Sequence, residues 1–225
     1  MYDWTWIFIL PGLLLGLWAQ AMVKNAYAKY AKVTSQRGVS AEEVARDILS
    51  RSGNGNISVA RISGNLTDNF DPRDRVVRLS EGVYGSRSIA AIGIAAHECG
   101  HAIQAGSEYG LFVLRTAIVP VVNIGSKLYF PIFMAGMVFS WEPLMNVGVI
   151  CFALIFLFSL VTLPVEINAS QRAVAVLREG GYVSEEEMKG VKAVLNAAAW
   201  TYVAAVISSL FQMLRLMMIA RRRRD

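Results

Sequence analysis

Two long hydrophobic runs without a single charge constrain this chain more than any other feature. They extend from Trp4 to Met22 and from Leu144 to Leu163. About 20 apolar residues in a helix cross the hydrocarbon core of a bilayer, and lipid offers the backbone no hydrogen-bond partner outside the helix itself. Hydrophobic residues make up 55% of the 225-residue chain, which is more than an ordinary soluble domain contains. We therefore expect a mainly α integral membrane protein.

The first run is expected to be an uncleaved anchor. Trp4, Trp6 and Trp18 lie near its ends, where aromatic residues meet the membrane interface. The alternative is a secretory signal peptide, because an Ala-Gln-Ala sequence at residues 19–21 resembles a cleavage site. Against that alternative, no basic residue precedes the apolar run, and the run is long.

Further membrane elements follow from the same pattern. The segments Leu111–Ile124 and Lys127–Phe139 are apolar but contain prolines, which predicts either one kinked helix or a helix plus a span. Ala197–Ala220 is expected to be the last apolar helix. Together with the anchor and the second uncharged run, the sequence predicts about four transmembrane or membrane-associated helices.

Residues 24–110 differ in character and predict a small α+β domain. Ser40 and Glu43 form a capping box at the start of a soluble helix that Gly53 ends. The sequences NISVARIS and RVVRLS predict short strands around a turn-rich segment. An Ala-rich buried helix is expected from Ser88 to Ala105.

The charge distribution predicts the topology. The net charge is +5, and on a membrane chain such an excess reflects cytoplasmic loops rather than nucleic-acid binding. The positive-inside rule therefore places residues 24–110 in the cytoplasm, and we expect the membrane to be a bacterial plasma membrane. The C-terminal cluster Arg221–Arg224 conflicts with this topology if the last helix spans fully, whereas a tilted interfacial helix would keep the cluster inside. Four basic residues follow the anchor: Lys24, Lys29, Lys32 and Arg37.

All the histidine of the chain lies in AAHECGHAIQ, residues 95–104. On a helix, His97 and His101 share one face, one turn apart, so both imidazoles can reach one metal ion. Neutral imidazole suits zinc. Zinc lowers the pKa of a bound water to about 7, and Glu98 can accept a proton from that water without being a ligand. The spacing His-Glu-x-x-His is the one that metallopeptidase chemistry needs.

The alternative is that these side chains are satisfied core residues. Their flanks are Ala, Ile and Gly, and two imidazoles with a carboxylate are costly to bury there without partners. Metal binding removes that cost, so we favour a metal site. Cys99 is expected to point away from the histidine face as a small buried thiol.

The third ligand must be a carboxylate or a cysteine, because a catalytic zinc keeps three protein ligands and no third histidine exists. Glu166 is the leading candidate, since an acidic group at the end of a span is a functional hypothesis by default. Small residues on its face, Ala169, Ser170 and Ala173, would allow close helix packing. Alternatively, Glu166 is a helix-start carboxylate behind Pro164. Weaker candidates for the ligand are Asp68, Asp71, Glu108 and Glu142.

Three blocks, LTD-x-x-DP, HE-x-GHA-x-Q and PVE-x-x-AS, carry a resemblance to a known family. With the anchor and the late apolar helices, the chain resembles the YugP-like family of neutral, HExxH-containing membrane zinc metallopeptidases over nearly its whole length. The resemblance implies Zn²⁺ bound by His97, His101 and, by analogy with other gluzincins, Glu166, with Glu98 as the general base. The sequence Glu166-x-x-Ala169-Ser170 also resembles the E-x-x-A-D of HtpX-type proteases, where Ser170 replaces an Asp that would hold a histidine ligand.

We therefore expect a membrane-embedded, zinc-dependent endopeptidase that acts on peptides or membrane proteins through a Glu-activated, zinc-bound water. Its expected parts are the anchor at 1–23, a zincin-like catalytic domain at 24–110, a membrane hairpin at 111–163, the helix and polar connection carrying the third ligand at 164–195, and a C-terminal membrane helix with a basic tail at 196–225. The lipid bilayer is the other expected partner, and the sequence gives no oligomeric state.

Two other classes remain as alternatives. One is a non-catalytic membrane scaffold or chaperone-like protein with a structural zinc, which would need a closed site of four ligands. The other is a transporter or channel. The small number of charged residues within the spans argues against this class. The turn from Asp68 to Asp71 either lines the substrate groove or is a loop held by Asx turns. Open candidates for stabilising an oxyanion are Tyr84, Tyr109 and Tyr202.

Overall fold

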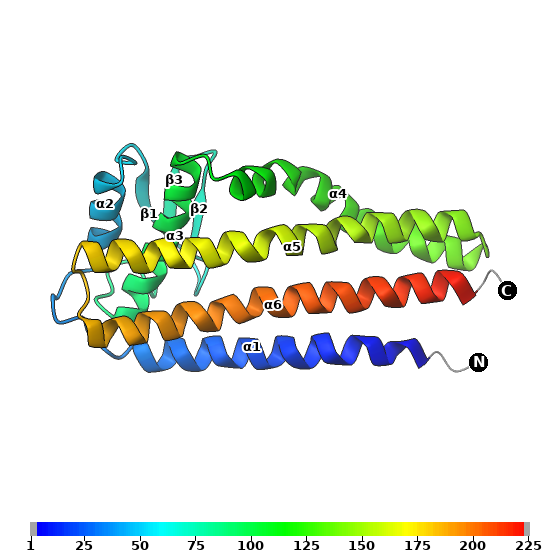
Figure 1. Cartoon of the computed structure of the whole chain (residues 1–225), viewed down its shortest axis with the longest axis horizontal. Helices are drawn as coiled ribbons and strands as arrows, with labels where there is room; N and C mark the ends of the chain where they lie inside the picture. The colour runs from blue at the N-terminus through cyan, green and yellow to red at the C-terminus, as the bar shows by residue number, and fades with distance from the viewer. Residues whose placement is uncertain (1–3, 223–225) are drawn as a thin grey trace. The chain divides into compact units, whose positions relative to one another are not determined.

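The computed structural model describes residues 4–222, and helices dominate it. This confirms the expected mainly α membrane-type fold with a small sheet (Figure 1). The elements in chain order are η1 (Trp4–Phe8), α1 (Ile9–Tyr30), α2 (Ala41–Arg51), β1 (Ser58–Ile62), β2 (Asn69–Asp71), β3 (Val76–Ser80), α3 (Ile89–Gly106), α4 (Gly110–Val138), α5 (Glu142–Glu179) and α6 (Glu185–Arg222).

The chain divides into two compact units. The helical unit comprises the described residues of 1–20, 114–164 and 200–225, and the sheet unit comprises 21–113 and 165–199. Four helices are long and apolar enough to cross a membrane: Thr5–Tyr30, Gly110–Val138, Glu142–Glu179 and Glu185–Arg221. This count agrees with the sequence prediction.

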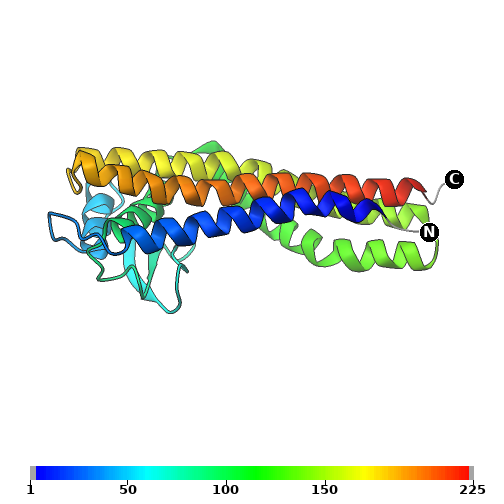
Figure 2. The same cartoon turned by 90° about the horizontal axis from the view of Figure 1, so that it is seen from below.

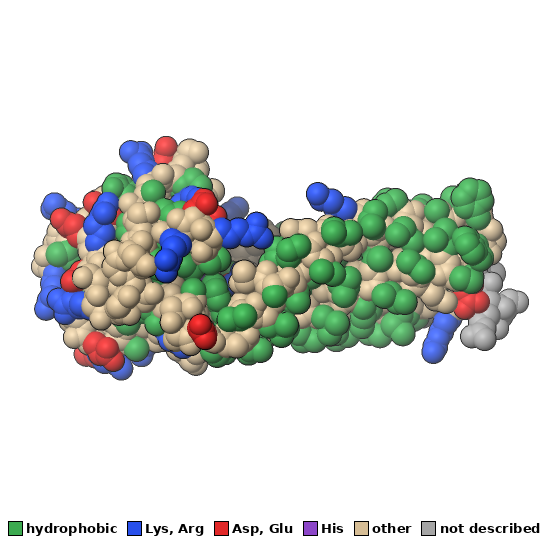
Figure 3. All heavy atoms as spheres, turned by 90° about the horizontal axis from the view of Figure 1, so that it is seen from above, with side chains coloured by type: hydrophobic (Ala, Val, Ile, Leu, Met, Phe, Trp, Pro, Cys, Tyr) green, Lys and Arg blue, Asp and Glu red, His purple; other side chains and the backbone are tan. Residues whose placement is uncertain are grey.

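The surface of the helical unit suits lipid. Large apolar side chains such as Leu14, Phe130 and Ile150 are at least 60% exposed, and in water this exposure would be unfavourable. Figure 3 shows hydrophobic side chains over most of its visible surface, whereas Lys, Arg, Asp and Glu gather over the sheet unit. Arg223 and Arg224 of the C-terminal basic cluster lie outside the described residues.

Close contacts through small residues hold the helical unit together. A Cβ atom added at Gly12 of α1 would lie 2.6 Å from the Ser208 hydroxyl of α6, so the two backbones approach closely. The same two helices bring Trp18 and Trp200 edge to face, 5.3 Å between ring centroids, and they run side by side in Figure 2. In lipid, such van der Waals packing replaces the hydrophobic driving force between helices.

Three prolines and a carboxylate lie inside helices rather than at their ends. Of the two alternatives for residues 111–139, the structure has one continuous helix, α4, with Pro120 and Pro131 in its interior. Likewise α5 continues through Pro164. The alternative that Glu166 caps a helix start is therefore wrong. Helix interiors in membranes tolerate proline because neighbouring groups satisfy the freed backbone.

The sheet unit contains three strands in the order β1-β3-β2. The strands β1 and β3 fall within the two predicted segments and pair in parallel, whereas β2 pairs antiparallel with β3. The sequence prediction missed β2, which lies in the segment expected to be turns. It has only three residues, NFD, which is too short a run for an alternation of apolar and polar residues to predict a strand.

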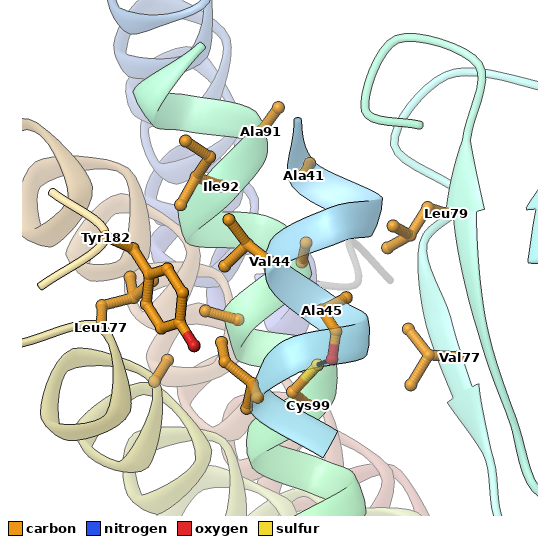
Figure 4. Packing of buried hydrophobic residues seen from close by; sticks show 14 of the residues in the cluster. Ala41, Val44, Ala45, Val77, Leu79, Ala91, Ile92, Cys99, Leu177 and Tyr182 are labelled. Carbon is orange, nitrogen blue, oxygen red and sulfur yellow. Dashed lines mark hydrogen bonds between the residues drawn. The ribbon is translucent and has the colours of Figure 1, made fainter. Parts of the chain in front are cut away.

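Helix α2 packs between α3 and β3 (Figure 4). Val44 and Ala45 of α2 belong to one buried cluster with Ile92 of α3 and with Val77 and Leu79 of β3. This cluster is the core that positions α3 within the unit.

Helix α2 begins as the sequence predicted. The Glu43 carboxylate accepts a hydrogen bond from the Ser40 backbone N–H at 2.8 Å, which confirms the capping box. A second capping box begins α6, where Glu187 and Ser184 exchange side chain-to-backbone bonds of 2.7 and 3.2 Å. Each box satisfies backbone donors that a helix start would otherwise leave unpaired.

Candidate metal centre

Helix α3 holds both histidines on one face. It begins at the N-cap Ser88, whose side chain accepts a bond from the Ala91 N–H, and most of its residues are buried. The His97 and His101 rings meet edge to face with centroids 4.8 Å apart. The predicted helix from Ser88 to Ala105 matches α3 to within one residue at each end.

Helix α5 brings Glu166 to these histidines. Its Oε2 lies 3.1 Å from Nε2 of His97 and 3.4 Å from Nε2 of His101. The Glu166 side chain is 3% exposed. Among the described residues, these three form the one group of His, Cys, Asp and Glu arranged to hold a metal ion, with all donor atoms within 4.8 Å of one another.

The three donor atoms fit zinc. Ligand atoms about 2.1 Å from a tetrahedral zinc ion lie roughly 3.4 Å from one another, and Glu166 Oε2 already lies within 3.4 Å of both Nε2 atoms. Two imidazoles and one carboxylate are also a ligand set found in catalytic zinc sites. Only small movements are needed for all three to contact one ion.

A glycine allows the two ligand-bearing helices to approach. A Cβ atom at Gly100 would lie 2.5 Å from the Ala169 carbonyl oxygen. Ala169 and Ala173 are themselves fully buried. The small residues that follow Glu166 thus pack against α3 at the level of the histidines, which is the arrangement that their size predicted.

Glu98 lies between the two histidines in sequence and is buried. The pKa of its carboxyl is raised to about 7, chiefly by burial and also by the nearby Glu166 and Asp68, whereas His97 and the Phe70 N–H oppose the rise. Glu98 is not in the three-residue group. A carboxyl with a pKa near neutrality can accept and release a proton at physiological pH.

Each histidine is held at its other ring nitrogen. The Ser170 hydroxyl lies 3.1 Å from Nδ1 of His97, and Oε1 of Gln104 lies 2.9 Å from Nδ1 of His101. A hydroxyl therefore occupies the place that the HtpX-type pattern gives to a carboxylate. Gln104 was not predicted as a site residue, although a glutamine in an Ala- and Gly-rich helix, three residues after His101, is a visible signal.

Aromatic side chains border the centre, and the sequence did not reveal them either. The Phe112 ring lies 6.1 Å from the His101 ring, and the Phe70 ring lies 6.4 Å from the Phe112 ring. Phe70 belongs to β2 and Phe112 to the first turn of α4. The two rings give one side of the centre an apolar wall.

The weaker ligand candidates have other partners. Asp68 accepts bonds from the backbone and the hydroxyl of Ser80 at 2.8 and 2.9 Å. Asp71 accepts from the Arg73 N–H in an Asx turn and from Arg78. The turn is thus held by its own side chains, as one alternative predicted. Glu108 and Glu142 also lie outside the three-residue group among the described residues.

The remaining candidates have structural contacts. The Cys99 thiol is buried and donates to the Ala45 carbonyl at 3.6 Å, and this burial raises its pKa. Tyr109 lies under the Arg172 guanidinium, 5.8 Å from its carbon to the ring centroid. Tyr84 packs against the buried core of the sheet unit.

Comparisons with known proteins agree with the site. The model of the family described as "Putative neutral zinc metallopeptidase" matches residues 5–221. The chain is 46% identical over 216 residues to a Bacillus subtilis (strain 168) protein named "Putative membrane protease YugP", with 96% of each chain covered. No solved structure matches. The resemblance seen in the sequence is confirmed: the chain belongs to the family described as "Putative neutral zinc metallopeptidase".

Proposed function

We propose that this protein is a membrane-embedded, zinc-dependent endopeptidase of the gluzincin type. The observation that carries the proposal is the convergence of His97 Nε2, His101 Nε2 and Glu166 Oε2 beside a buried fourth residue, Glu98. Three ligands rather than four favour a catalytic over a structural zinc. Within the described part of the chain, the group has three members, which argues against the scaffold alternative.

The residues of the centre divide the chemistry between them. When bound, zinc polarises the scissile carbonyl and lowers the pKa of water. Glu98 takes the proton from the attacking water on its carboxylate and later delivers it to the nitrogen of the leaving amine. Its pKa of about 7 suits both steps. Ser170 and Gln104 keep the histidine rings in place during these transfers.

The edge of the sheet offers a place for an extended substrate. Strand β2 is an edge strand, paired on one side with β3, and the Phe70 N–H lies beside Glu98. An unpaired strand edge binds extended peptides through backbone hydrogen bonds. A peptide along β2 would pass the metal centre, and the Phe70 and Phe112 rings would favour an apolar side chain next to the cleaved bond.

The substrate is proposed to be a peptide or membrane protein reached from the cytoplasm. The basic residues after the anchor support this sidedness through the positive-inside rule. A second basic group on α5 and α6 agrees, because the predicted membrane hairpin returns the chain to the same side. Its members are Arg172, Arg178, Lys189 and Lys192.

The deciding experiment compares the purified wild type with Glu98→Gln and His97→Ala in detergent. Zinc content and hydrolysis of a fluorogenic peptide are measured for each. Glu98→Gln should keep about one zinc per chain and lose roughly 10²–10⁴-fold in kcat, whereas His97→Ala should lose the zinc as well. A Glu98→Gln variant that hydrolyses peptides normally would remove the enzyme proposal and favour the scaffold.

A further inference from the structure

Gln104 makes more specific contacts than a buried core residue needs. Its side chain is fully buried. Oε1 lies 2.9 Å from His101 Nδ1, and Nε2 donates to the Val165 carbonyl at 2.8 Å and to Asn168 Oδ1 at 3.0 Å. One carboxamide on α3 thus contacts a histidine on its own helix and two groups on α5.

The chemistry of these neighbours fixes how the carboxamide is oriented. The Val165 carbonyl can only accept a hydrogen bond, so the amide nitrogen of Gln104 must face it. Asn168 Oδ1 also accepts from the Arg172 guanidinium at 2.8 Å, and a guanidinium can only donate. The Gln104 nitrogen is therefore held on the α5 side, and its oxygen faces His101.

That orientation determines the tautomer of His101. An amide oxygen accepts hydrogen bonds, so Nδ1 of His101 must carry the proton. In the neutral ring, Nε2 then has the free lone pair, and Nε2 is the atom that faces Glu166 Oε2 at 3.4 Å. The Ser170 hydroxyl does not fix the tautomer of His97 in this way, because a hydroxyl can donate as well as accept a hydrogen bond.

We propose that Gln104 is a positioning residue for the metal centre. It holds His101 in the tautomer that can ligate through Nε2, and it ties the carbonyl of Val165, next to Glu166, to the helix that carries both histidines. The inference rests on the proposed zinc-binding function. Partners of this kind orient metal ligands, and their loss typically lowers metal affinity by about 10- to 100-fold.

The test uses the fact that the chain has two histidines. In zinc-loaded protein labelled with ¹⁵N-histidine, NMR should show both rings ligated through Nε2 and protonated at Nδ1. Gln104→Met keeps the side-chain shape but not the acceptor. It should alter the His101 signals and lower zinc affinity by roughly 10- to 100-fold in chelator competition, while the His97 signals stay unchanged. The matched control is Gln171→Met, because Gln171 is exposed on α5.

A second variant separates positioning from space filling. Gln104→Glu retains an acceptor for His101 Nδ1 but loses the donor to the Val165 carbonyl, so it should recover the His101 signals relative to Gln104→Met without recovering the full zinc affinity. A space-filling role predicts no such recovery, because Glu adds a buried charge. The inference is overturned if Gln104→Met leaves the His101 signals and zinc affinity unchanged, or if Gln104→Glu does not restore the His101 signals that Gln104→Met alters. Absence of zinc from the wild type would instead overturn the proposed function.

Discussion

Oε2 of Glu166 lies 3.1 Å from Nε2 of His97, although 69 residues separate them in the chain. A buried carboxylate beside two imidazoles is costly unless a shared proton or a cation balances it. The contact therefore makes Glu166 the third ligand in the proposed function, and it makes the packing of α5 on α3 a condition for metal binding.

The third ligand can be tested by comparing two glutamates on the same helix. Glu166→Gln should weaken zinc binding by at least about 100-fold, since the substitution removes a metal ligand rather than a residue that orients a ligand. Glu142→Gln should have no effect, because Glu142 lies in the first turn of α5 and contacts Asn146. Chelator competition measures both variants. A stronger effect of Glu142→Gln would contradict the gluzincin assignment.

The close approach of α3 and α5 gives a second prediction. Gly100→Ala would place a Cβ atom 2.5 Å from the Ala169 carbonyl oxygen, and backbone shifts of this kind cost about 1–3 kcal/mol. We expect a lower Tm and weaker zinc retention together. The control is Gly16→Ala on α1, where nothing lies within 4 Å of the added Cβ. Equal effects of the two substitutions would mean that helix propensity, rather than the close approach of α3 and α5, accounts for the change in Tm and zinc retention.

Local periodicity explains which site residues the sequence could predict. His97, Glu98 and His101 lie on one helix, so their spacing alone predicts that they share a site. Glu166 was predictable from its place after an apolar run and before small residues. For Gln104 the sequence shows a polar residue in an apolar helix, but not its contacts, because its partners Val165 and Asn168 lie 61 and 64 residues away.

The elements of the fold can also be separated into those that the sequence could predict and those that it could not. Long apolar helices and the capped start of α2 are properties of contiguous sequence, and the sequence predicted them. Strand β2 depends on pairing with β3, through contacts such as Phe70 opposite Val77. Three residues are too few for their alternation to predict a strand. The apolar wall of Phe70 and Phe112 was missed for the same reason, since tertiary pairing alone brings these two rings together.

The apolar wall predicts substrate preference. Phe112→Leu removes the ring that lies 6.1 Å from the His101 ring. For the proposed peptidase, kcat/KM should fall by about 10-fold for a peptide with a large apolar residue next to the cleaved bond, relative to one with alanine. Phe130→Leu is the control, because Phe130 is an exposed phenylalanine on the same helix. An unchanged preference in Phe112→Leu would show that the wall does not contact the substrate.

The proposed sidedness can be tested with single cysteines in a Cys99→Ala, Cys151→Ala background. Basic residues surround the first and second reporters, Arg37→Cys and Lys189→Cys, and the positive-inside rule places both in the cytoplasm. Trp141→Cys lies in the exposed turn between α4 and α5, which the predicted hairpin places on the opposite side. In intact cells, a membrane-impermeant thiol reagent should therefore label Trp141→Cys alone, and the other two should react after the cells are opened. The reverse pattern would place the metal centre outside the cytoplasm. Labelling of Arg37→Cys without Lys189→Cys would contradict the two-span hairpin, because that hairpin is what places His97 and Glu166 on the same side of the membrane.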